Sequence, residues 1–177
     1  MRATGVVRRI DDLGRIVIPK EIRRTMRMKE GDPLEIFTES NGEIVLRKYS
    51  MMEGVLSISQ RFADSLNKVS GLNCVVCDGD RVVAYGGANK KDNIDKPITK
   101  DTEELCTSRM SYFKQFQGEK PLFTHIGATM PVMGIIPIIS GGDCAGAIAL
   151  LGENEQILSD TQKKLLILTS TLLAENL

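Results

Sequence analysis

The first fifty residues alternate between β-rich and turn-forming stretches, a pattern that predicts a small unit built mainly from strands. Residues 3–10 and 13–18 carry many β-branched side chains and flank two aspartates at 11–12, which predicts two pairing strands. A helix follows at Pro19, whose missing N–H costs nothing in the first turn of a helix. Two more apolar stretches flank the Asn-Gly pair at 41–42, a strong hairpin signal. The predicted order is β-β-α-β-β.

Helical spacing replaces this pattern in the next segment. Apolar residues recur every three or four positions over 52–69, and Gly71 follows, which predicts a helix that ends there. Beyond it the pattern predicts a β-hairpin, a helix over 101–110 and a second hairpin. A capping box then opens a last helix, predicted over 160–176.

We therefore expect an α+β protein in three parts: residues 1–50, a connecting helix over 51–70, and a second domain over 71–177. Fifty residues are too few to bury a good core alone, because even a 60-residue domain buries only about 60% of its unfolded surface. We expect the first part to fold as an intertwined dimer.

The basic charge of the chain is concentrated near its start. The whole chain balances 23 basic residues against 23 acidic ones, yet residues 2–29 hold 9 basic residues, 7 of them arginines, against 3 acidic ones. Arginine presents a planar fork of donors that suits phosphates and guanine edges. This basic segment indicates a polyanionic partner, and double-stranded DNA is the first to consider.

The stretch from Thr4 to Lys48, which contains TGVVRRIDDLGRIVIP and EGDPLEIF, resembles the swapped-hairpin DNA-binding domain of AbrB-type transition-state regulators. The later stretches GLNCVVCDGDRVVAYGG and VMGIIPIISGGDCAGAIALLG resemble the GAF-like domain that follows such a domain in sporulation regulators. The resemblance implies a swapped-hairpin β-barrel dimer, a GAF-like domain with an antiparallel sheet and flanking helices, and a tetramer. It also implies a transcription regulator, both activator and repressor, that acts in the forespore.

The same resemblance places Arg8, Arg15, Arg23 and Arg24 at the DNA. Arg9 is a weaker candidate, because neighbouring residues of a strand point to opposite faces. Arg23 and Arg24 lie about 100° apart on a helix, so both can stay exposed. The basic segment holds no Asn or Gln, the residues that pair with adenine, so we expect DNA shape to decide the preference for a degenerate A·T-rich site.

Two other functions compete with DNA-binding regulation. AbrB-like domains also serve as antitoxins with short disordered tails that wrap a toxin, but residues 71–177 are predicted to be folded. Some GAF domains reduce free methionine sulfoxide with cysteines. Here Cys74 and Cys77 lie three positions apart on a predicted strand, which places their sulfurs on opposite faces. We therefore expect no enzyme activity, no catalytic residue, no metal site and no cofactor.

A small molecule is a further candidate partner. A GAF-like pocket between the sheet and residues 101–126 is expected to be lined by Tyr85, Cys106 and His125, the single histidine. Packing in the interior explains these three residues equally well. The sequence leaves both interpretations open.

The last predicted helix carries leucines over a wider surface than one contact with a sheet requires. We expect one face to cover its own domain and another to pair with the 52–69 helix of a second protomer, although a single buried helix is the alternative. The residues expected at this oligomer contact are Val55, Phe62, Leu66, Leu165, Leu168 and Leu172.

Membrane and export signals do not change this interpretation. The longest apolar runs fall far short of the about 18 residues that a membrane span needs. The first residues show no secretory pattern of a charged start, an apolar stretch and a cleavage site. We expect a cytoplasmic protein with no membrane partner.

Overall fold

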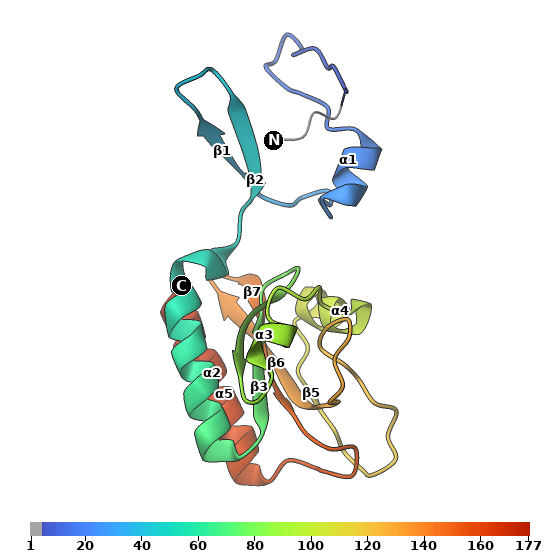
Figure 1. Ribbon diagram of the computed structural model, residues 1–177, viewed down its shortest axis with the longest axis vertical. Coiled ribbons are helices and arrows are strands. Elements are labelled where there is room, and N and C mark those ends of the chain that lie inside the picture. Colours follow the sequence, from blue (N-terminus) through green and yellow to red (C-terminus); the bar gives the residue numbers. More distant parts are fainter. Residues whose placement is uncertain (1–4) are drawn as a thin grey trace. The chain divides into compact units, whose positions relative to one another are not determined.

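The computed structural model describes residues 5–177, and these divide into two compact units between Tyr49 and Ser50 (Figure 1). We call residues 5–49 the N-terminal unit and Ser50–Leu177 the C-terminal unit. Residues 51–70, expected as a connector, belong to the C-terminal unit, where Met52 is fully buried. Both helices and antiparallel sheets are present, so the α+β prediction is confirmed.

The N-terminal unit contains one short helix and one hairpin. Helix α1 (Lys20–Thr25) begins directly after Pro19. Strands β1 (Leu34–Thr38) and β2 (Ile44–Lys48) pair antiparallel, as predicted. The loop that joins the two strands is longer than the Asn-Gly pair. It lies between Glu39 and Glu43, where Glu39 N–H donates to the Glu43 carbonyl oxygen.

The two strands predicted before α1 are not present in the single chain. Residues 5–18 have no strand assignment, and residues 3–4 of the first predicted strand lie outside the described range. Backbone hydrogen bonds close the turn of this segment, where Asp11 N–H donates to Arg15 O and Gly14 N–H donates to Asp11 O. A strand is defined by continuous pairing with a neighbouring strand, and residues 5–18 are not assigned to one.

The hairpin of the N-terminal unit has an uncovered apolar face. Ile36 lies opposite Leu46 in the antiparallel register, and both side chains are exposed, as is Ile44. No residue in the range 5–49 is buried. This unit therefore has no core of its own within one chain.

The C-terminal unit is built on a five-stranded antiparallel sheet in the order β4-β3-β7-β6-β5. A 3-10 turn, η1, leads into α2, which ends at Gly71 in the left-handed conformation. The capping box at the start of α5 is formed as predicted, between Ser159 and Gln162. The elements are η1 (Met51–Val55), α2 (Leu56–Ser70), β3 (Asn73–Cys77), β4 (Val82–Gly86), α3 (Lys90–Asn93), α4 (Lys100–Ser108), β5 (Tyr112–Phe113), β6 (Val132–Ser140), β7 (Asp143–Leu151) and α5 (Asp160–Glu175).

Helices cover both faces of this sheet. Helices α2 and α5 run side by side on one face, joined by a 2.9 Å hydrogen bond from Gln162 Nε2 to the Ser70 carbonyl oxygen (Figure 1). Gly86 lets α2 approach β4 closely, because a Cβ there would lie 2.1 Å from the Ala63 carbonyl oxygen. Helix α4 packs over β7 on the other face. Each face has its own apolar cluster, with Leu150 in one and Ile135 in the other.

Candidate nucleic-acid interface

The five candidate DNA-binding arginines all lie in the N-terminal unit, and all are exposed. Arg8 and Arg9 occupy the irregular segment before the turn, where Arg8 donates to the carbonyl oxygen of its neighbour. Arg23 and Arg24 form the basic last turn of α1. Cations at a helix C-terminus complement its dipole, so local stability and ligand binding favour the same charges there.

Arg15 is held at the turn by Asp11. Asp11 Oδ1 accepts hydrogen bonds from the backbone N–H groups of Leu13 (3.1 Å) and Arg15 (2.7 Å), and Oδ2 accepts one from Arg15 Nε at 2.8 Å. The hydrogen bonds from the Arg15 backbone and then its side chain hold the pKa of Asp11 below its ordinary value. The sequence pattern indicates Asp11 only as a turn residue. Its position four residues before an arginine, with Gly14 between them, is the signal that could have revealed the contact.

Other basic residues of this unit are engaged in internal contacts. The Lys48 ammonium lies 3.1 Å from an Asp32 carboxylate oxygen. The Arg47 guanidinium lies 4.8 Å from the centre of the Phe37 ring across the hairpin. These contacts stabilise the hairpin, whereas the arginines of the turn and α1 present exposed donors to an anion.

The three candidate pocket residues lie in the interior of the C-terminal unit. Tyr85 and Cys106 belong to the apolar cluster under α4. His125 is also buried, with Nδ1 2.8 Å from the Thr124 hydroxyl and Nε2 2.8 Å from Asn93 Oδ1. Burial, helped by the nearby charge of Lys96, lowers the pKa of His125 from 6.5. The structure thus places these three residues in the packed interior of the C-terminal unit.

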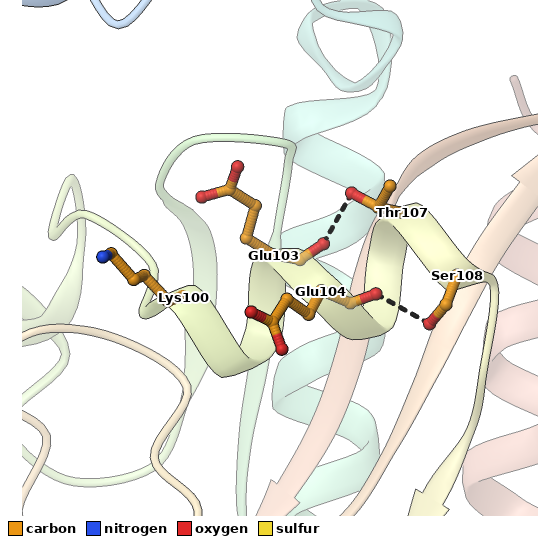
Figure 2. Close-up of a pocket in the computed structure, with 5 residues that line it drawn as sticks. All are labelled: Lys100, Glu103, Glu104, Thr107 and Ser108. Atoms are coloured by element: carbon orange, nitrogen blue, oxygen red, sulfur yellow. Dashed lines mark hydrogen bonds between the residues drawn. The ribbon is translucent and has the colours of Figure 1, made fainter.

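A shallow hollow lies elsewhere, along the outer side of α4 (Figure 2). Two of its hydroxyls are already used inside the helix, since Thr107 donates to the Glu103 carbonyl oxygen and Ser108 to that of Glu104. The lining residues are Lys100, Glu103, Glu104, Thr107 and Ser108. This is a solvated face of one helix, and the predicted pocket residues are not part of it.

The four cysteines are free thiols. Cys74 packs in the cluster under α2 and α5 and Cys77 in the cluster under α4, so the prediction of opposite faces is confirmed. A hydrogen bond with Cys144 lowers the pKa of Cys106, but contact with Cys77 and burial outweigh it and raise that pKa to about 12. Because the thiolate is the reactive form, this environment disfavours cysteine chemistry at neutral pH.

The residues predicted for the oligomer contact differ in their exposure to solvent. Leu66 is only 4% exposed and is part of the core, whereas Leu168 is 54% exposed on α5. The others are partly covered by their own chain: Val55, Phe62, Leu165 and Leu172.

The described residues contain neither a membrane-crossing helix nor a cluster of side chains that could hold a metal ion. In the range 5–177, no helix has both the length and the apolar character that crossing a membrane requires. The same residues contain no group of three or more His, Cys, Asp or Glu side chains placed to hold a metal ion.

Known proteins resemble the two units separately. Residues 7–53 match the family described as antidote-toxin recognition MazE, bacterial antitoxin. Over 49 residues, 28% of this chain and half of the relative, the sequence is 51% identical to the transition state regulatory protein AbrB of Bacillus subtilis. The GAF domain of an Acinetobacter phosphoenolpyruvate-protein phosphotransferase shares the C-terminal fold, with a TM-score of 0.53 and 10% identity over 72% of this chain and 93% of that one. These matches define the class: a chain with an AbrB-like N-terminal unit and a C-terminal unit of GAF-like fold.

The family follows from matches that cover most of the chain. Residues 55–177 match the family described as stage V sporulation protein T C-terminal, transcription factor. The chain is also 40% identical over 164 residues to stage V sporulation protein T of Bacillus subtilis, which covers 93% of this chain and 92% of that protein. The chain belongs to the stage V sporulation protein T family of sporulation transcription regulators. This membership favours the regulator over the antitoxin and reductase alternatives.

Proposed function

We propose that the N-terminal unit forms an intertwined dimer that binds double-stranded DNA through Arg8, Arg15, Arg23 and Arg24, with Arg9 contributing less. The observation that carries this proposal is a folded unit that buries none of residues 5–49 and exposes all of these arginines. Apolar faces that one chain leaves uncovered require a second copy. The arginines supply donors for phosphates and guanine edges.

The uncovered residues of the N-terminal unit support an interleaved arrangement. They lie on the segments before and after the turn as well as on the hairpin, so a partner chain must reach several elements at once. The strands predicted within residues 5–18 would then form by pairing with that partner. The exposed apolar residues are Val6, Val7, Ile10, Leu13, Ile16, Val17, Met26, Ile36, Ile44, Leu46 and Tyr49.

The C-terminal unit is proposed to join two such dimers into a tetramer. Ile167 and Leu168 are exposed on α5, next to partly buried Leu165 and Leu172. A continuous apolar strip of this kind suits pairing with a helix of another protomer. Leu66 is excluded from this contact, because its side chain is already buried in its own core.

The assembled protein is proposed to act on DNA without catalysis, as an activator and a repressor in the cytoplasm of the forespore. The family membership and the raised pKa of the Cys106 thiol support a role as regulator rather than enzyme. Because the basic segment contains no Asn or Gln to pair with adenine, the shape of A·T-rich DNA is proposed to decide the preference.

DNA-binding affinity measured at several salt concentrations tests this function. Two protomers with four arginines each can neutralise up to about eight phosphates, so log K against log[salt] should fall with a slope of roughly −4 to −7. Arg23→Ala or Arg24→Ala should weaken binding about 5- to 10-fold and make the slope shallower by about 1 for each phosphate that is no longer neutralised. Arg61→Ala on α2 is the matched control, because Arg61 is exposed in the other unit. A slope near zero for the native protein contradicts the proposal.

A further inference from the structure

The carboxylate of Asp11 divides its two oxygens between two tasks. Oδ1 accepts from the backbone N–H groups of Leu13 and Arg15 and so builds the turn. Oδ2 accepts from the Nε of Arg15 at 2.8 Å and so holds a side chain. One residue thereby fixes both the loop and the arginine that the loop presents.

The contact leaves the outer end of Arg15 available. A guanidinium has five N–H donors, and Nε carries only one of them. The Arg15 side chain is 70% exposed while this bond is made, so the terminal nitrogens remain open to solvent. Fixing a long side chain before binding removes part of the rotamer entropy that would otherwise be lost on the DNA.

We propose that Asp11 is a positioning residue for DNA binding, which holds Arg15 through Nε so that its terminal nitrogens meet a phosphate or a base edge. This inference rests on the proposed function. Asp11 also carries a negative charge, which repels DNA. Positioning of Arg15 and repulsion of DNA therefore have opposite effects on the affinity for DNA. Asp12 is an exposed aspartate in the same loop, and we expect it to contribute the repulsion without the positioning, so it serves as a comparison.

The test compares Asp11→Asn with Asp12→Asn in the full chain, by titration of one double-stranded A·T-rich DNA fragment. Asparagine keeps an oxygen for the two backbone N–H groups but replaces Oδ2 with an NH₂ group, which cannot accept from Arg15 Nε. We expect Asp11→Asn to weaken binding about 3- to 10-fold although it removes a negative charge. Asp12→Asn should bind as well as the native protein or slightly more tightly.

A double-mutant cycle with Arg15→Ala shows whether Asp11 acts through Arg15. In the Arg15→Ala background, Asp11→Asn should cause no further weakening. Two results overturn the inference: Asp11→Asn that binds as tightly as Asp12→Asn, or an equal loss with and without Arg15. A native protein that does not bind DNA contradicts the proposed function itself. If Asp11→Asn lowers the melting temperature, Asp11→Ser is used in its place, because the serine hydroxyl still accepts from the backbone. The same DNA-binding results are expected for this variant.

Discussion

The two units of this chain bury their apolar residues in different ways. In the C-terminal unit, a sheet between two layers of helices encloses one apolar cluster on each face, and Ile148 and Leu150 are completely buried. In the N-terminal unit, none of residues 5–49 is buried. The same exposed fraction therefore has different meanings in the two units. An exposed isoleucine on a unit with its own core is ordinary surface, whereas one on a unit without a core indicates a missing partner.

Charge separates the two units in the same way. Residues 1–50 hold 11 basic and 8 acidic residues, and residues 51–177 hold 12 and 15. A DNA duplex therefore attracts the first unit and is repelled by the second. We infer that the N-terminal unit makes the contact with DNA, whereas the C-terminal unit has the stable core.

A matched pair of substitutions gives the sharpest test of this comparison. Ile36 on β1 is 66% exposed and Ile126 in the C-terminal unit is 59% exposed, so the single chain predicts that both tolerate aspartate. If Ile36 lies in a dimer core, Ile36→Asp buries an unpaired carboxylate, a change that costs several kcal/mol or more. We expect Ile36→Asp to unfold the N-terminal unit and abolish DNA binding, with the C-terminal unit intact. Ile126→Asp should leave both unchanged.

Calorimetry of the full chain distinguishes these outcomes, since each unit should give its own transition. The transition of the N-terminal unit should also rise in temperature with protein concentration, as expected where folding and association are coupled. Equal tolerance of both substitutions would mean that the N-terminal unit is stable without a partner.

The C-terminal fold could largely be predicted from sequence, because its signals are local and its partners lie in the same chain. Helical spacing and Gly71 predicted α2, and the Ser159–Gln162 capping box predicted the start of α5. The short elements α3 and β5 were missed. Helix α3 has four residues and depends on tertiary contacts, including the hydrogen bond between Asn93 and His125, which no local pattern reveals.

The N-terminal unit shows the opposite limit. Its β-rich segments before α1 have the composition of strands, but a strand is defined by pairing, and residues 5–18 of the single chain are not assigned to a strand. The arginines were predicted as DNA contacts because clustering and resemblance both indicate them, and they stay a prediction. The contact between Asp11 and Arg15 depends on the turn geometry, which the sequence suggests only through the aspartate before Gly14.

A second substitution sharpens the comparison within the C-terminal unit. Leu168 is 54% exposed on α5, and we expect it to contact another protomer. Leu168→Glu should divide the proposed tetramer into folded dimers, because a carboxylate is unfavourable in an apolar contact. Loss of bivalency should weaken binding to long DNA by about 10²-fold, with little change on one short site.

Light scattering during size-exclusion chromatography measures this change directly. Ile157→Glu is the control, because Ile157 is also exposed but lies outside the strip on α5. An intact protein that already runs as a dimer, or a Leu168→Glu protein that unfolds, contradicts the proposed contact.

The smallest expected effect is a pH dependence confined to the C-terminal unit. His125 is the single histidine of the chain, and burial, with the charge of Lys96, lowers its pKa from 6.5. The amide nitrogen of Asn93 donates to the Asn89 carbonyl oxygen, so Asn93 Oδ1 accepts from His125 Nε2, and a neutral ring then accepts from Thr124 at Nδ1. The folded unit therefore excludes the proton that the unfolded chain takes up.

The sign of the effect follows from this difference in proton uptake. Below pH 6.5 the unfolded state binds more protons than the folded state, so stability falls as the pH drops from 6.5 towards the lowered pKa and is fully retained above 6.5. His125→Gln should lower stability at about pH 7 because its hydrogen bonds are not replaced, yet the difference between native and variant should shrink as the pH falls through this window. Melting curves between about pH 5 and 8 measure this difference, where His is the side chain that ordinarily changes charge. The melting temperature of the N-terminal unit should be the same in both proteins at every pH, since it contains no histidine. A difference between native and variant that stays constant across the window would mean that His125 is protonated as readily in the folded unit as in the unfolded chain.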